Sequence, residues 1–190
     1  GPHLAQQLGG EEAYQAYLWD MGLTEEMNQR LTRVYYLYAK MLASVTEEGS
    51  PLYITDEVLY QYEGITEDTI LADHILLLTG EDEEENQALY ATMEQLLQTL
   101  RSADPSEASL LFNYLADNIS EDTGRAYYPN GYLLTEDSDY VQEFKDAAFA
   151  LEENEFSDIV TTEYGYHIIM RKPIREYVAD QYLSELLTVA

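Results

Sequence analysis

The sequence predicts an α+β protein in which helices cover a mainly antiparallel sheet. From residue 70 to 172 the segments follow the order strand, helix, helix, strand, helix, strand, strand. This order lacks the regular alternation of strands and helices that is typical of a parallel sheet. Before and after this region the apolar residues recur with the helical period instead. We therefore expect one α+β domain flanked by helices.

Composition excludes several functional classes. The chain has 9 basic and 37 acidic residues, which gives a net charge of −28. Because binding to phosphates requires a basic surface, nucleic acids and anionic membrane surfaces are not expected partners. Cysteine is absent, which excludes disulfides, thiolate catalysis and cysteine-bound zinc. No apolar run approaches the roughly 20 residues that span a bilayer.

The first third of the chain has a helical pattern. A short helix is expected over residues 11–20, and Thr24 is a favourable N-cap for a longer one. The apolar face of that long helix recurs at spacings of 3 and 4 and comprises Met27, Leu31, Val34, Tyr38, Met41 and Val45. The breaker EEGSP ends it at 47–51, and Thr55 begins another short helix.

The region from 70 to 120 begins with a buried strand, ILADHILLLT. The acidic run EDEEE at 81–85 follows, and carboxylates at a helix start complement the helix dipole. The helix after it has an apolar face that comprises Leu89, Met93, Leu96 and Leu100. A second helix is expected from the sequence Asp-Pro-Ser-Glu at 104–107, which combines an N-cap, a first-turn proline and a capping-box glutamate.

The remaining segments complete the sheet. A turn-rich stretch at 120–131 leads to a short strand at 132–135. A helix spans about 140–151, and Asn154 suits a turn because asparagine tolerates a left-handed backbone. Segments 159–162 and 166–170 read as a hairpin, and a last helix covers about 174–187.

Two histidines occupy equivalent places in strand-like segments. His74 in ADHILLL and His167 in GYHIIMR each precede an apolar run, whereas His3 lies in a Gly-Pro-His start that is typical of a tag remnant. A single histidine on an apolar strand is most often a core residue, so a structural role and a functional role both remain open. The sequence has no HExxH-like cluster, and we expect neither a metal nor another cofactor.

Three blocks of the sequence resemble the parvulin-type peptidyl-prolyl cis-trans isomerases. They are DHILL at 73–77, F-x-x-L-A-x-x-x-S-x-D at 112–122, and F-x-x-A-A-F-x-L at 144–151, which continues through E-x-S-D-I-V-x-T to YGYHII. The ends of the chain, among them GGEEAYQAYLWDMGLTEE, resemble those of foldases of the PrsA and SurA type.

The resemblance implies a domain organisation. Residues 70–172 would form a parvulin-like domain with a four-stranded, mainly antiparallel sheet. This domain would be inserted between an N-terminal helical segment, 1–69, and a C-terminal helix, 173–190. The two ends would pack on each other and form a chaperone-like helical domain.

The resemblance also implies the site. His74 and His167 would lie side by side on adjacent central strands, within hydrogen-bond reach of each other, and Asp122 would orient them. Phe144 would form a wall of the proline pocket, and Thr162 would join the polar network. The residues expected to bind substrate are Tyr140, Val141, Phe144, Thr162 and Tyr166.

Two stretches depart from the family pattern. Parvulins usually carry G-G-x-L-G near the second strand, where this chain has PNGYLL at 129–134. The basic cluster of phosphate-reading parvulins is replaced by EDEEE at 81–85. Recognition of phosphorylated Ser-Pro or Thr-Pro is therefore not expected, and we expect a preference for unphosphorylated, neutral or basic peptides.

The function implied is that of an isomerase that acts as a foldase on unfolded or secreted proteins. The alternative is a holdase chaperone that binds unfolded chains without significant isomerase activity. The expected partners are unfolded or proline-containing polypeptides, with membrane contact only through a lipid anchor outside this sequence. The expected location is extracellular or the envelope of a bacterium, and the sequence leaves the oligomeric state open.

Overall fold

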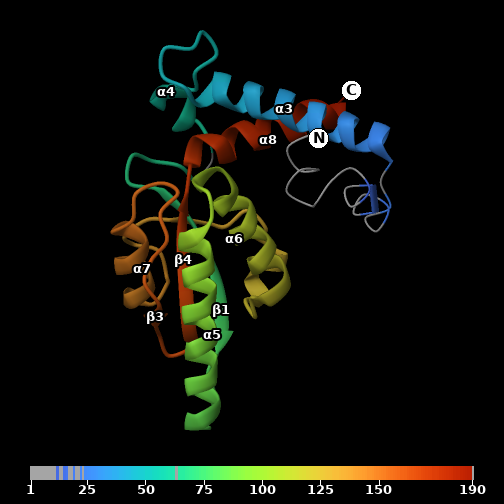
Figure 1. Ribbon diagram of the computed structural model, residues 1–190. Coiled ribbons are helices and arrows are strands. Elements are labelled where there is room, and N and C mark those ends of the chain that lie inside the picture. Colours follow the sequence, from blue (N-terminus) through green and yellow to red (C-terminus); the bar gives the residue numbers. More distant parts are fainter. Residues whose placement is uncertain are drawn as a thin grey trace. The chain divides into compact units, whose positions relative to one another are not determined.

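The computed structural model describes residues 12, 15, 16, 19, 22, 24–62 and 64–189 (Figure 1). It divides into two compact units, Gly1–Tyr53 and Ile54–Ala190, which are described separately. The helix expected over 11–20 lies mostly outside the described residues. The expected packing of the C-terminal helix on the N-terminal segment concerns both units and stays a prediction.

The first unit contains the long helix α3, Glu25–Thr46. Thr24 caps it as predicted, because its side-chain oxygen accepts a hydrogen bond from the Met27 amide at 3.2 Å. Glu25 and Glu26 lie in the first turn, where carboxylates complement the positive end of the helix dipole. The predicted start of this helix is thus confirmed, and it ends at Thr46, directly before the predicted breaker at 47–51.

The second unit is built on a four-stranded antiparallel sheet. Its strands are β1 (Ile70–Leu78), β2 (Tyr132–Leu134), β3 (Val160–Thr161) and β4 (Gly165–Lys172). They lie in the order β2-β1-β4-β3, and each neighbouring pair is antiparallel. This confirms the α+β class and the hairpin that the sequence predicted, and it places the two histidine-bearing strands next to each other at the centre.

Helices cover both faces of this sheet (Figure 1). Helices α5 (Glu83–Ser102) and α6 (Pro105–Ile119) pack on one face, and α7 (Gln142–Phe149) packs on the other. A single 3-10 turn, η1 (Thr123–Ala126), leads from α6 towards β2. No helix of the described residues is both long and apolar enough to cross a membrane.

Alternation along β1 distributes its side chains between two cores. Ile75 and Leu77 belong to the cluster under α5 and α6, whereas Ile70 and Ala72 belong to the cluster under α7. Every residue from 70 to 77 is buried, which explains the continuous apolar run in the sequence. Since successive side chains of a strand point to opposite faces, His74 faces α7.

The last helix, α8 (Ile174–Val189), is fixed to the segment that precedes the sheet. Arg175 donates to the Ile54 carbonyl at 3.2 Å and pairs with Asp56 in the short helix α4 (Asp56–Leu59). The rings of Tyr62 and Tyr177 meet edge to face at 6.0 Å. Residues from 54 onwards therefore belong structurally with the sheet unit.

Candidate active site

His74 and His167 lie on adjacent strands and on the same face of the sheet. His74 pairs across the ladder with Ile169, and His167 pairs with Leu76, so the two histidines are diagonal neighbours. Their ring centroids are 5.1 Å apart with an interplanar angle of 67°. Only 7% of His74 and 3% of His167 are exposed. The expected placement of the two residues is therefore confirmed.

The two imidazoles are not hydrogen bonded to each other. Both ring nitrogens of His74 and Nδ1 of His167 have no hydrogen-bond partner, and Nε2 of His167 contacts the Thr162 hydroxyl at 2.8 Å. The expected bond between the histidines is thus wrong for this structure, because the rings meet edge to face. Thr162 joins the polar network as expected.

Asp122 approaches His74 from the loop after α6. Its Oδ2 lies 3.2 Å from Nε2 of His74, a distance that suits an ion pair, although the two groups are not aligned as a hydrogen bond. The same oxygen accepts a hydrogen bond from the Tyr132 hydroxyl at 2.5 Å, and Oδ1 accepts one from the Gly124 amide at 2.9 Å. The carboxylate is thus held from three sides.

These contacts control the charge of the carboxylate. Burial alone raises the pKa of Asp122, but the contacts with His74, Tyr132 and the Gly124 amide outweigh it and lower the pKa well below its usual range. Asp122 is therefore ionised at neutral pH. His167 behaves differently, because burial and then the charge of His74 lower its pKa to about 4. His167 is therefore neutral at pH 7.

These groups open into a cavity of about 600 Å³. Phe144, which is 2% exposed, forms its apolar wall from α7. The Phe144 ring lies 5.1 Å from the His74 ring and 5.7 Å from the His167 ring. Tyr140 stacks on Phe144 at 5.9 Å and reaches solvent. The cavity thus combines an aromatic wall with a small buried polar network.

Six of the eight predicted site residues line this cavity, and they are His74, Asp122, Tyr140, Val141, Phe144 and His167. Thr162 acts on the site through His167. Tyr166 lies on the opposite face, where its ring meets Tyr90 of α5 edge to face at 5.2 Å. Placing Tyr166 in the substrate pocket is therefore corrected, since the neighbour of an inward-facing strand residue points the other way.

Sequence reasoning missed Tyr132. Its hydroxyl donates to Asp122, and its ring lies 5.7 Å from that of His74. Gly131 precedes it with a φ of 103°, and a Cβ there would come within 2.8 Å of the Ala72 carbonyl oxygen. The only signal in the sequence was the departure from the family pattern at 129–134, which marks this strand as different.

A buried ion pair was also missed. One nitrogen of Arg125, Nη1, donates to both carboxylate oxygens of Asp73 at 2.7 and 2.8 Å, and Asp73 is 1% exposed. Arg125 also contacts Asp117, and Lys172 lies 3.5 Å from Asp73. Because Arg125 belongs to η1, whose N-cap is Asp122, this pair fixes η1 to β1 beside the site.

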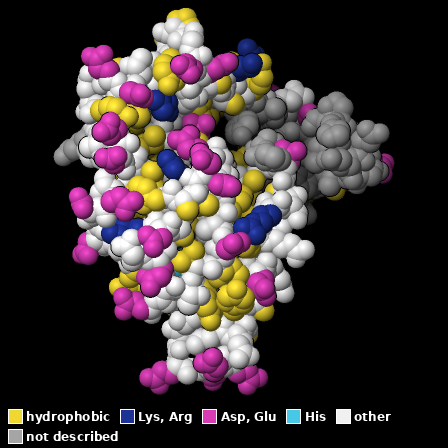
Figure 2. Space-filling view, turned by 90° about the vertical axis from the view of Figure 1, so that its left-hand side faces the viewer, with side chains coloured by type: hydrophobic (Ala, Val, Ile, Leu, Met, Phe, Trp, Pro, Cys, Tyr) yellow, Lys and Arg dark blue, Asp and Glu magenta, His cyan; other side chains and the backbone are white. Residues whose placement is uncertain are grey.

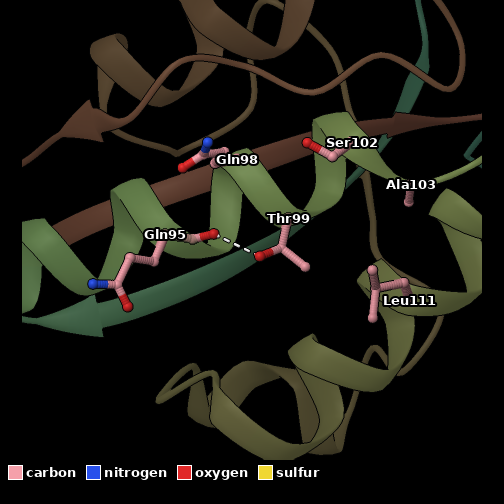
Figure 3. Close-up of a pocket in the computed structure, with 6 residues that line it drawn as sticks. All are labelled: Gln95, Gln98, Thr99, Ser102, Ala103 and Leu111. Carbon is pink, nitrogen blue, oxygen red and sulfur yellow. Dashed lines mark hydrogen bonds between the residues drawn. The ribbon is translucent and has the colours of Figure 1, made fainter.

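A second hollow of about 600 Å³ lies between α5 and α6 and is drawn in Figure 3. Amides, hydroxyls and small apolar groups line it, and the lining residues are Gln95, Gln98, Thr99, Ser102, Ala103 and Leu111. It contains no charged or imidazole side chain that could act on a substrate. Among the residues that the structure describes, no three His, Cys, Asp or Glu are grouped so as to hold a metal ion.

The antiparallel sheet and the histidine-lined cavity define a parvulin-type domain. A family model, Rotamase, described as a PPIC-type PPIase domain, matches residues 74–172, which is just over half of the chain. The chain belongs to this family of peptidyl-prolyl isomerase domains.

Individual relatives are similar over most of the chain. The Foldase protein PrsA of Staphylococcus aureus is 28% identical over 191 residues, which covers 97% of this chain and 54% of the relative. The Foldase protein PrsA of Halalkalibacterium halodurans is 33% identical over 164 residues, which covers 84% of this chain and 44% of the relative. The chain thus spans about half the length of the curated relatives that it matches.

Solved structures give a weaker comparison. The crystal structure of PrsA from Bacillus subtilis is 22% identical, with 98% of this chain and 67% of that chain covered, and the TM-score is 0.42. The fold assignment therefore rests on the sheet itself and on the family match.

Proposed function

We propose that this protein catalyses the cis–trans isomerisation of X-Pro bonds in unfolded polypeptides and acts as a foldase. The observation that carries the proposal is the cavity in which Phe144 and two buried histidines face one another beside the ionised Asp122. Family membership supports it. Relatives named as foldases support the cellular role.

The chemistry needs neither a covalent intermediate nor a metal. Resonance keeps the X-Pro bond planar, so isomerisation takes tens to hundreds of seconds without a catalyst. The transition state is a twisted amide in which that resonance and its charge separation are reduced. A site that binds the twisted amide more tightly than either planar form lowers the barrier.

In this proposal the proline ring packs against Phe144, and the twisted amide lies beside His74. The His74 ring lines the cavity, and neither of its nitrogens has a hydrogen-bond partner within the protein. His167, neutral at pH 7, supports the His74 ring edge to face and is fixed in turn by Thr162. Asp122 and Tyr132 hold the other edge of the His74 ring.

The test is a Phe144→Ala variant measured with a short X-Pro peptide and in proline-limited refolding of an unrelated protein. Loss of the aromatic wall should lower kcat/KM by about tenfold or more. Phe149→Ala is the matched control, because Phe149 lies on the same helix, is half-buried and does not line the cavity. Equal activity of wild type and Phe144→Ala would remove the site assignment.

The holdase alternative is separated by the same assay. A pure holdase would suppress aggregation of an unfolded client while leaving the proline-limited phase at its uncatalysed rate.

We propose a location outside the cytoplasm of a bacterium, secreted or anchored at the envelope, and this rests on the resemblance to the bacterial PrsA foldases.

A further inference from the structure

The mouth of the cavity carries negative charge from three separate loops. Glu121 precedes η1, Asp139 precedes α7, and Glu163 lies in the turn between β3 and β4. With Asp122 inside, four of the thirteen lining residues are acidic, and none is lysine or arginine. A peptide that enters the cavity therefore meets carboxylates on several sides.

Glu121, Asp139 and Glu163, which we call the rim, surround the same cavity that His74 lines. His74 lines the cavity, 9% of its side chain is exposed, and its Nδ1 has no hydrogen-bond partner. Leaving buried polar atoms unpaired is costly, and the imidazole that carries them lines the cavity. The acidic residues thus surround an opening that already has an independent mark of ligand binding.

All three rim carboxylates are exposed, and one of them is fixed by a hydrogen bond. Asp139 and Glu163 face solvent. Glu121 is also exposed, and its Oε2 accepts a hydrogen bond from the Leu78 amide at 2.7 Å. The Glu121 carboxylate is therefore held at the rim and does not swing freely.

We infer that this site selects polypeptides in which lysine or arginine lies next to the proline, and that it disfavours glutamate or a phosphorylated residue there. The turnover part of this inference rests on the proposed isomerase function, whereas the binding part does not. One exposed ion pair changes affinity by about 1.5- to 5-fold. Attraction of lysine and repulsion of glutamate together should give a ratio of about fivefold to tenfold at low salt.

We attribute this preference to the rim carboxylates and not to the acidic run at 81–85. That run lies where α5 begins, at the lower tip in Figures 1 and 2, and none of its residues lines the cavity. Asp82 there accepts hydrogen bonds from the amides of Glu84 and Glu85, which is the ordinary role of a helix cap. The run therefore serves as a control for the effect of overall charge.

The experiment uses the full chain and four peptides that differ only in the residue before proline, which is lysine, alanine, glutamate or phosphothreonine. Isomerisation rates and, independently, peptide affinities by fluorescence anisotropy are measured in 20 mM and 500 mM salt. We expect the order lysine, alanine, glutamate, phosphothreonine in both measurements. The lysine-to-glutamate ratio should shrink at high salt, because exposed charges are screened.

Two double variants locate the effect. In Asp139→Asn/Glu163→Gln the lysine-to-glutamate ratio should fall to about 2 or less, with each rate normalised to the alanine peptide of the same variant. In Glu84→Gln/Glu85→Gln, which removes the same charge at the start of α5, the ratio should stay at its wild-type value. An equal fall of the lysine-to-glutamate ratio in both variants would overturn the inference, since the overall charge of the protein would then cause the preference.

The outcomes also separate the inference from the proposed function. Selective binding without turnover would support the charge selection and remove the isomerase proposal. Turnover with equal affinities and equal rates for the lysine and glutamate peptides would support the isomerase and overturn the charge selection.

Discussion

Asp122 shows how one carboxylate serves three partners. Its Oδ2 accepts the Tyr132 hydroxyl and faces Nε2 of His74, and its other oxygen caps η1 through the Gly124 amide. The carboxylate therefore couples the position of a backbone turn to the position of the His74 ring in the candidate site. Tyr132 completes this arrangement from the strand at the edge of the sheet.

Removing the Tyr132 hydroxyl should loosen this arrangement. Tyr132→Phe keeps the ring and deletes a hydrogen bond to a charged group, which should reduce the free energy of unfolding by about 1.5–3 kcal/mol. Activity should fall several-fold, since the Asp122 carboxylate is then less firmly oriented towards His74. Urea unfolding and the peptide assay measure the two effects.

The matched control is Tyr128→Phe. Tyr128 is 56% exposed and packs on Tyr132 with ring centroids 5.2 Å apart, so its hydroxyl can be deleted without touching Asp122. A loss of stability in Tyr128→Phe as large as that in Tyr132→Phe would contradict the role given to the bond with Asp122.

Protonation of His167 gives a pH-dependent prediction. The pKa of His167 is lowered to about 4 in the folded protein, against about 6.5 in an unfolded chain. The unfolded state therefore binds more protons between these values, and stability should decrease as pH falls from about 6.5 to 4. His167→Asn should flatten this part of the stability curve, and the ring resonances of His167 should titrate near pH 4 by NMR. A midpoint near 6.5 would show that burial does not act on this ring.

Asp122 adds a second component to the pH dependence of stability, at lower pH than that of His167. Its folded pKa is depressed, so its contribution is present above the unfolded pKa of about 3.9 and is lost as pH falls further. Asp122→Asn should remove that acid-sensitive component while leaving the component above pH 5 in place. Urea unfolding at a series of pH values would show a single unchanged curve if this assignment were wrong.

The residues of the site differ in how far the sequence could predict them. His74, His167, Asp122 and Phe144 belong to motifs, and motif order was sufficient to place them around one cavity. Tyr166 was misplaced, although strand alternation next to His167 would have excluded it.

Two further contacts lay outside the reach of motif reasoning. Tyr132 of β2 donates to Asp122, and Arg125 of η1 pairs with Asp73. No local period specifies such contacts, because they depend on where the loop crosses β1. The edge-to-face geometry of the two imidazoles likewise depends on strand register rather than on the motifs.

At the level of elements, η1 is held to the central strand β1 by a buried ion pair. Its Arg125 is paired with the buried Asp73 of β1, and breaking such a pair leaves an uncompensated charge. Arg125→Ala should therefore reduce the free energy of unfolding by about 3–5 kcal/mol. Activity should decrease as well, because Asp122 caps the same turn.

The comparison variant is Arg101→Ala. Arg101 pairs with Asp158 at the surface, where the two side chains are 49% and 91% exposed, so the expected cost is below about 1 kcal/mol. Chemical unfolding of both variants measures the difference. A cost for Arg125→Ala no greater than that for Arg101→Ala would show that Lys172 alone satisfies Asp73.

The elements themselves were largely predictable. Periods of two and of three to four residues gave the strands and helices of the sheet unit in the correct order, because burial on one or two faces dictates them. The N-terminal boundary of the sheet unit was harder to predict from the sequence. Residues 54–62 carry a helical pattern like the segment before them, and their contacts with α8, such as that between Arg175 and Ile54, show where they belong.

At the scale of the whole molecule, the relation between the two ends remains a prediction. We expect the apolar face of α3, with Met27, Leu31 and Val34, to share a core with Val178, Tyr182 and Leu186. Because the chain has no cysteine, pairs of introduced cysteines report on this without interference. At least one pair that joins position 27, 31 or 34 to position 178 should form a disulfide on oxidation and raise the Tm. Failure of every pair to cross-link would remove the inserted-domain arrangement.

The lengths of the outer strands have a consequence for a protein that handles unfolded chains. β2 and β3 form the two edges of the sheet, with only 3 and 2 residues. An edge strand offers unpaired amide and carbonyl groups to any extended chain, and a long one would template aggregation. Edges this short present too few such groups for a lasting β-addition. The foldase proposed here can thus hold an extended client at its cavity without recruiting it into its own sheet.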